Sequence, residues 1–300
     1  LYIFIVSADG KLASVRKLAT GSGGDNGLAA PAVIDTDNDG RADLVVAGDL
    51  KGNVWRFDIS AQAPGDWRVG LDGLPLFKAR GPDNQPQPIT ARLHVARNDR
   101  ASDKNFGKLF AFFGTGAYFR EEDPASTRVQ SWYGLLAEAG SPIGQDRGTL
   151  VKRRIEQVGT FAGRTVRTFS RAASGDMTGR QGWYIDFNQP PAGERIVTNS
   201  QVLNLGIPAL LAVSLVPTAD KPCDPGGRGF LNVVEPFTGG GTEVGVLDVN
   251  ASNRFEDDRL GDRPIGSVEL SVGAPSAAAA MNAGNLTLVL VGGSGAKDAQ

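Results

Sequence analysis

The chain has 300 residues, a length that fits either one large β domain or two smaller domains. It carries 31 Lys and Arg against 33 Asp and Glu, and this formal charge of −2 argues against roles that need a broadly basic surface, such as binding nucleic acid or an anionic membrane. With one His and one Cys, a zinc site built from these side chains is excluded, and a Ser/His/Asp triad could use only His94.

The chain opens on an apolar run, residues 1–6, which predicts a β-strand. This segment has no basic leader and no small-residue cleavage site, and it does not begin with Met. We therefore expect the chain to be a fragment of a larger protein. The longest apolar run, near residues 207–216, is about half of the ~20 residues that a membrane-spanning helix needs, so no membrane span is expected in this fragment.

Residues 35–43 read Asp-Thr-Asp-Asn-Asp-Gly-Arg-Ala-Asp, which matches the first nine positions of an EF-hand-type calcium loop. Alternate residues of such a tight loop turn their side chains inward, and the glycine permits the sharp turn. The predicted ligands are Asp35, Asp37, Asp39, the Arg41 carbonyl and Asp43. Hard oxygen donors in this number select Ca²⁺ over a transition metal. The motif therefore predicts one bound Ca²⁺, with an Asp-rich turn that holds no ion as the alternative.

The loop departs from a true EF-hand at its end. Position twelve is Val46, so the bidentate Glu is missing, and residues 44–47 read as a strand. We expect a strand-flanked, EF-hand-like loop in which Asp43 is the bidentate ligand.

The rest of the chain has the pattern of an all-β protein. Short apolar and β-branched runs, bounded by Gly, Pro, Asn and Asp, recur about every ten residues, and helical periodicity is nearly absent. Apolar and polar residues alternate over residues 55–59 and 183–187, which predicts two half-buried strands. Further predicted strands are 44–47, 109–113, 131–137, 209–216, 230–234, 243–249 and 286–291, and His94 is interpreted as a strand residue. Residues 277–280 fit a helical turn or a tightly packed strand.

A faint internal repeat favours a β-propeller. The sequence around Gly52 to Asp58 resembles that around Gly229 to Glu235, each with a turn glycine, an apolar strand and an acidic residue. At ~40–45 residues per four-stranded blade, 300 residues predict about seven blades in a quinoprotein-like, modified propeller. A pair of two-sheet sandwiches is the alternative architecture.

A second segment, residues 248–258, keeps alternating oxygen-bearing side chains but lacks the glycine and two of the acids of the first loop. It can be interpreted as a decayed copy of the calcium loop. A solvated acidic loop is the simpler interpretation, and it is the one that the sequence favours.

The sequence resembles the PilC/PilY-type type IV pilus tip proteins. The resemblance starts with the calcium loop and the strand that ends Val-Trp-Arg-Phe-Asp at residues 54–58. It continues in residues 113–119, 130–134, 182–186 and 193–197 and in the Pro222-Cys223 pair. It implies a single modified β-propeller over residues 1–300, the carboxy-terminal part of a larger protein, with the calcium ligands at the positions named above. No Arg-Gly-Asp tripeptide occurs in the chain, so an integrin-type contact is not implied.

The resemblance also implies a function. We expect a non-enzymatic, calcium-binding regulatory domain that supports pilus extension against retraction, twitching motility and surface adhesion. Its expected partners are minor pilins, the pilus assembly machinery, and host or abiotic surfaces. The expected location is the pilus tip at the cell surface, reached through the periplasm and outer membrane. The alternatives are a quinoprotein-like dehydrogenase, which usually relies on a vicinal cysteine pair that this chain lacks, and a carbohydrate-binding propeller.

Overall fold

The computed structural model describes residues 1–101, 103–144, 147–189, 193–217, 227–284 and 286–295. Within these ranges the regular structure is β-strand, apart from five 3-10 turns: Pro64–Asp66, Leu71–Gly73, Asp123–Ala125, Arg147–Thr149 and Phe255–Asp257. The all-β prediction is confirmed. No helix in the described part of the chain is long and apolar enough to cross a membrane. The Pro222-Cys223 pair lies outside the described residues.

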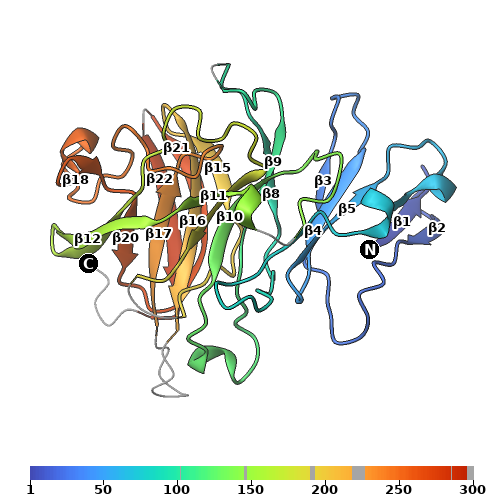
Figure 1. Ribbon diagram of the computed structural model, residues 1–300, viewed down its shortest axis with the longest axis horizontal. Helices are drawn as coiled ribbons and strands as arrows, with labels where there is room; N and C mark the ends of the chain where they lie inside the picture. The colour runs from blue at the N-terminus through green and yellow to red at the C-terminus, as the bar shows by residue number, and fades with distance from the viewer. Residues whose placement is uncertain (102, 145–146, 190–192, 218–226, 285, 296–300) are drawn as a thin grey trace.

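Three sheets of five or six strands carry the fold (Figure 1). The first sheet contains β3 (Ala32–Ile34), β4 (Leu44–Gly48), β5 (Asn53–Asp58) and β6 (Arg68–Val69), with β7 (Phe77–Lys78) also paired to β5. The second has the order β11 (Val151–Arg153), β14 (Gly182–Asp186), β10 (Ser131–Leu136), β9 (Leu109–Gly114) and β8 (His94–Arg97). The third has the order β12 (Ile155–Phe161), β13 (Arg164–Phe169), β20 (Ser267–Leu270), β17 (Arg228–Val234), β16 (Pro208–Val216) and β15 (Gln201–Asn204).

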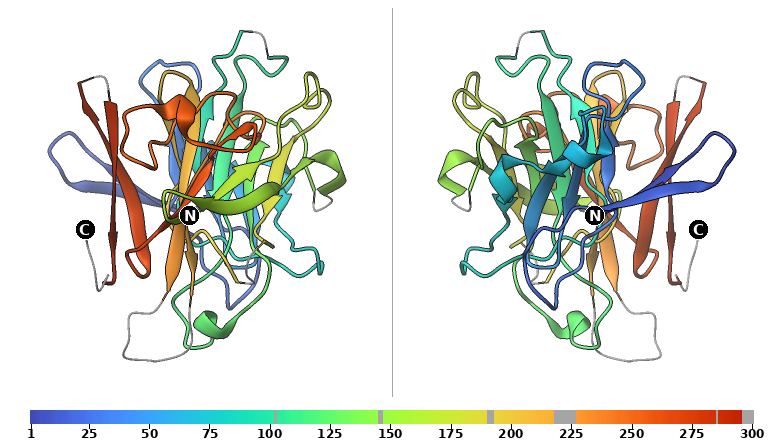
Figure 2. Two further views of the ribbon diagram at one scale, coloured as in Figure 1. Left: turned by 90° about the vertical axis from the view of Figure 1, so that its left-hand side faces the viewer. Right: turned by 90° about the vertical axis from the view of Figure 1, so that its right-hand side faces the viewer.

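Three two-stranded hairpins complete the described structure. They are β1 (Tyr2–Val6) with β2 (Leu12–Lys17), β18 (Arg259–Leu260) with β19 (Arg263–Pro264), and β21 (Pro275–Ala283) with β22 (Leu286–Gly293). The first and last of these, blue and red in Figure 2, point to the same side in both of its views but lie towards opposite ends of the long axis in Figure 1. We refer to them as the terminal hairpins.

The sheets are layers held together by four apolar cores. One core lies between the β1–β2 hairpin and the first sheet, one between the first and second sheets, one between the second and third, and one between the third sheet and the β21–β22 hairpin. Each central strand serves two cores because side chains alternate along a strand. In β9, Ala111 and Phe113 face the first sheet, whereas Phe110 and Phe112 face the third. The uninterrupted apolar runs are therefore strands that are covered on both faces.

Face-to-face packing of successive sheets is how propeller blades associate, but the expected count of about seven four-stranded blades is not confirmed. The described residues form three large sheets and three hairpins. Four strands per blade do not describe the large sheets, which have five or six strands, and irregular loops, such as the one between β7 and β8, take up many of the remaining residues.

Most strand predictions are confirmed: residues 277–280 form part of strand β21, and His94 begins β8. Two other details are wrong. Residues 243–249 are irregular, since Gly245 packs against the backbone of Phe255, where a Cβ would clash with the carbonyl oxygen. The strand β14 was expected to be half-buried, yet all of it is buried, because apolar cores cover both of its faces and Asp186 finds partners in the interior.

Candidate metal centre

The 35–43 loop connects two antiparallel strands of the first sheet, β3 and β4. Its neck is closed by the N–H of Asp43, which donates to the carbonyl of Ile34 at 2.9 Å. The carbonyl of Asp43 in turn accepts from the N–H of Ile59 at 2.8 Å. The two ends of the loop are thus fixed by strand pairing, and the conformation of the residues between them is set by the loop's own hydrogen bonds.

The first aspartate organises the turn. Asp35 accepts from the N–H of Asn38 at 2.7 Å and from that of Gly40 at 2.8 Å, one bond to each carboxylate oxygen. Asn38 and Gly40 both have positive φ, 63° and 88°. Asparagine and glycine are the residues that adopt this left-handed conformation most readily. The sequence Asn-Asp-Gly therefore favours the turn that wraps the backbone around Asp35.

The structure brings three of the predicted ligands together. Carboxylate oxygens of Asp35, Asp37 and Asp39 all lie within 4.8 Å of one another. Two like charges ~4 Å apart repel by about 4 kcal/mol at an effective dielectric constant near 20, so this arrangement favours a bound cation. Three oxygen donors of this kind fit a hard ion such as Ca²⁺.

The other two predicted ligands lie at the exit of the loop. The N–H of Arg41 donates to Asp39 at 2.7 Å, and the Arg41 side chain is exposed. The Oδ2 atom of Asp43 accepts from the N–H and the hydroxyl of Thr36 at 2.7 and 2.6 Å. These hydrogen bonds, the hydroxyl first, lower the pKa of Asp43. Asp43 does not belong to the converging group of three, and its Oδ1 atom is the oxygen that remains for an ion.

The loop borders an open groove of about 630 Å³ between the first and second sheets. Arg97, at the end of β8, crosses to the loop and donates to the carbonyl of Thr36 at 2.6 Å. The groove is lined on one side by Val33, Asp35 and Asn38, on the other by Arg92, His94 and Ala96, and at its end by Gln201 and Ala277. Burial, followed by the charge of Arg92, lowers the pKa of His94. The loop is therefore one wall of a surface groove.

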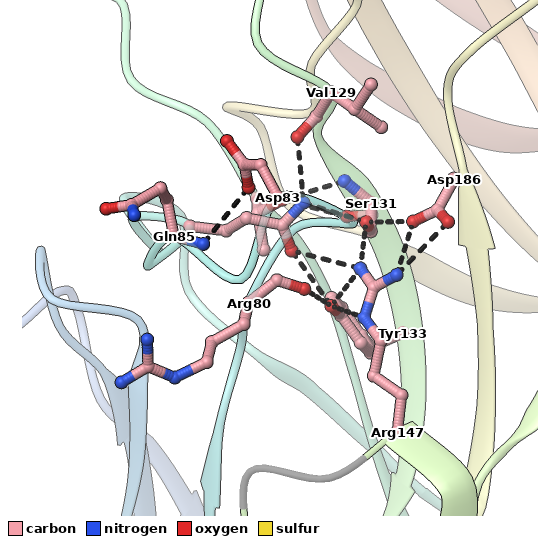
Figure 3. Close-up of polar contacts among 10 residues, drawn as sticks. Arg80, Asp83, Gln85, Val129, Ser131, Tyr133, Arg147 and Asp186 are labelled. Atoms are coloured by element: carbon pink, nitrogen blue, oxygen red, sulfur yellow. Dashed lines mark hydrogen bonds and ion pairs between the residues drawn. The ribbon is translucent and has the colours of Figure 1, made fainter.

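A second polar cluster, which sequence analysis missed, surrounds Arg147 (Figure 3). The guanidinium donates to both carboxylate oxygens of Asp186 at 2.9 and 3.1 Å, to the Ser131 hydroxyl at 2.8 Å and to the Tyr133 hydroxyl at 2.8 Å. It also lies 4.3 Å from the ring centroid of Tyr184. We call these residues the Arg147 cluster.

The Arg147 cluster is closed by further bonds within the interior. Tyr133 donates to Gln87 Oε1 at 2.8 Å, and Gln87 Nε2 donates to the Val129 carbonyl at 2.9 Å. Its polar groups are engaged with one another, which explains how Asp186 and Tyr184 can be buried on a strand expected to face solvent on one side. The partners are distant in sequence, so no local motif could have revealed the cluster.

The comparisons with known proteins agree with one another. A family model described as the PilY1 beta-propeller domain matches residues 1–155. The "Type IV pilus biogenesis factor PilY1 homolog" of Xylella fastidiosa is 32% identical over 266 residues, which cover 86% of this chain and 17% of that protein. The chain belongs to the PilY1 β-propeller family.

Two further PilY1 proteins support this placement. "Type IV pilus biogenesis factor PilY1" of Pseudomonas aeruginosa PAO1 is 30% identical over 274 residues, which cover 79% of this chain and 23% of that protein. The crystal structure of the P. aeruginosa PilY1 C-terminal domain superimposes with a TM-score of 0.77 at 24% identity, and the match covers 96% of this chain and 64% of that one. That likeness shows the fold. The chain spans about a fifth of the length of the curated PilY1 relatives.

Proposed function

We propose that this chain is a calcium-binding regulatory domain of a type IV pilus biogenesis factor. Its PilY1 relatives are named as biogenesis factors. The observation that carries the calcium assignment is the convergence of Asp35, Asp37 and Asp39 within 4.8 Å. The ligand set is these three carboxylates, the Arg41 carbonyl and Oδ1 of Asp43.

The ion acts on the loop by mass action. An ion that binds the folded loop and not the unfolded chain stabilises the folded loop by RT ln(1 + [L]/Kd). Occupancy also neutralises the mutual repulsion of the three carboxylates. The ion-bound loop is consequently the more rigid and less negatively charged state.

The groove gives this local change a functional consequence. Asp35 and Asn38 belong both to the loop and to the groove wall. The charge and rigidity of the groove wall therefore differ between the calcium-free and the calcium-bound loop, so a partner in the groove binds the two states with different affinity. Calcium can regulate the partner only through this difference in affinity. The partner is a protein of the pilus assembly machinery, such as a minor pilin, and its binding in the calcium-bound state supports pilus extension against retraction.

This function places the domain outside the cytoplasm, at the pilus tip on the cell surface. Calcium modules in that environment have Kd values of about 10⁻⁴–10⁻³ M. Since Asp37 and Asp39 are exposed, the 35–43 loop suits such a moderate affinity. Twitching motility and attachment to host or abiotic surfaces follow from the same regulation of pilus extension.

The test is made in cells that express the full-length protein with Asp39→Ala, which removes one converging carboxylate. The matched control is Asp9→Ala, an exposed acid paired with Lys11 in the β1–β2 hairpin. Sheared surface pilin is measured with and without the retraction motor. We expect Asp39→Ala to reduce surface pilin when retraction is active and Asp9→Ala to leave it unchanged. Normal piliation with Asp39→Ala, in protein shown to have lost calcium, would contradict the regulatory role.

A further inference from the structure

The 248–258 loop has the same backbone turn as the 35–43 loop. In the first loop the fourth and sixth positions, Asn38 and Gly40, have positive φ. In the second loop the fourth and sixth positions are Ala251 and Asn253, with φ of 56° and 58°. An alanine in this conformation is uncommon, since its Cβ makes the left-handed region costly. The surrounding loop must therefore impose the turn on it.

The hydrogen bonds of the second loop repeat those of the first at three positions. The first residue, Asp248, accepts at Oδ2 from the N–H of the sixth, Asn253, at 2.9 Å. The third, Asn250, accepts from the N–H of the fifth, Ser252, at 2.9 Å. The fifth in turn accepts at Oγ from the N–H of the seventh, Arg254, at 3.2 Å. The first, third and fifth side chains thus occupy the places that Asp35, Asp37 and Asp39 occupy in the first loop.

Asp258 is the counterpart of Asp43. Its carboxylate accepts at Oδ1 from the N–H of Val249, the second loop position, at 3.2 Å, as Asp43 accepts from Thr36. Its backbone carbonyl accepts from the N–H of Ile265 at 3.0 Å. The 3-10 turn Phe255–Asp257 makes this loop two residues longer before the closing acid.

Asp258 also provides an observation that is independent of the loop's shape. Its side chain is fully buried, and its Oδ2 atom has no hydrogen-bond partner among the described residues. A buried carboxylate oxygen without a partner is costly unless a cation or a donor satisfies it.

We propose that the 248–258 loop is a second calcium site, with Asp248, Asn250, Ser252, the Arg254 carbonyl and Asp258 as its ligands. This replaces the interpretation as a solvated acidic loop. The set has two carboxylates, whereas the first loop has four, so its affinity is lower. The loop adjoins β18 at one end of the long axis in Figure 1, while β3 and β4 lie towards the other end, so the two sites bind independently.

The experiment is calcium titration calorimetry on the chain with Asp39→Ala, which disables the first loop only. We expect one weaker binding event to remain, and Asp258→Asn to remove it. The matched control is Asp262→Asn, an exposed acid in the β18–β19 turn that is paired with Arg171. It should leave the weaker event unchanged. If the Asp39→Ala protein binds no calcium at up to about 10 mM, above the ~10⁻⁴–10⁻³ M range of weak extracellular sites, the proposal fails.

A gain-of-function variant keeps the test decisive if Asp258→Asn does not fold. Ser252→Asp supplies a third carboxylate at the fifth position, where the first loop has Asp39. If the loop is a calcium site, we expect about tenfold tighter binding, since ligand charge tunes affinity in such loops. Unchanged affinity with Ser252→Asp would overturn the proposal. If neither loop binds calcium, the proposed function is also refuted. If only the second loop fails to bind calcium, the proposed function stands and only the second site is refuted.

Discussion

At the scale of single residues, Gly40 tests whether the turn of the 35–43 loop depends on backbone freedom. Its φ is 88°, and a Cβ added there would meet nothing within 4 Å. Gly40→Ala therefore isolates the conformational cost, about 1–2 kcal/mol for a residue held in the left-handed region. We expect a lower unfolding free energy in urea and weaker calcium binding.

The matched control is Gly65→Ala, at another open position where φ is not positive. It should change neither quantity by more than about 0.5 kcal/mol. Equal effects of the two substitutions would show that the turn does not require glycine.

Tyr133 gives a prediction on pH. Burial, opposed in part by Arg147, raises its pKa from 10.0 to about 12. Below the unfolded pKa both states are protonated and the full stability is present. Above it the unfolded chain releases a proton that the folded chain keeps, so stability falls as the pH rises towards 12. With ~1.4 kcal/mol per pKa unit, we expect a loss of about 2–3 kcal/mol.

Urea unfolding at about pH 9 and about pH 11 measures the first half of this loss, about 1.4 kcal/mol. Tyr133→Phe, which cannot ionise, should lose less stability over the same interval. An equal loss in the two proteins would assign the alkaline effect to other groups, such as Tyr184, whose pKa burial also raises.

At the scale of elements, the Arg147 cluster ties the turn that contains Arg147 to strands β10 and β14. Removing one partner of a buried ion pair leaves the other charged and unpaired, which costs about 3–5 kcal/mol. We expect Arg147→Ala to lower the unfolding free energy by about this amount. Arg154→Ala removes an exposed pair with Glu156 and should cost less than about 1 kcal/mol. Similar costs for the two variants in urea unfolding would show that the cluster does not stabilise the fold.

The elements also show what the sequence can and cannot predict. The strands β9 and β16 were predictable because apolar runs bounded by turn residues signal strands without reference to distant partners. The convergence of the 35–43 carboxylates was predictable for the same reason, since spacing and the glycine determine it locally. The burial of Asp186 was not predictable, because it depends on Arg147, 39 residues away in sequence. For residues 248–258 the sequence favoured a solvated acidic loop, because Asn253 replaces the glycine and the closing acid, Asp258, lies two positions later.

At the scale of the whole molecule, the terminal hairpins carry unusual surfaces. Tyr2, Phe4 and Val6 are each more than half exposed on β1, as are Met281 and Leu290 on the β21–β22 hairpin. Contiguous exposed apolar faces promote association.

We expect Phe4→Thr combined with Leu290→Thr to reduce binding of an apolar dye and to slow aggregation. The unfolding free energy should change by less than about 1 kcal/mol, since both side chains are exposed. Leu211→Thr, at a fully buried core position, should instead destabilise strongly. Unchanged aggregation in the double variant would show that these faces do not govern association.

We propose that the 35–43 loop binds Ca²⁺ through its converging carboxylates, and calcium calorimetry on the isolated chain is the decisive experiment. We expect the wild type and Asp9→Ala to share the same tighter binding event, and Asp39→Ala to lose it. Mg²⁺ should compete poorly, because a many-oxygen, flexible loop suits the larger ion. If calorimetry detects no heat of calcium binding with the wild type, or if Asp39→Ala binds calcium with the same affinity as the wild type, the 35–43 loop is not the calcium site.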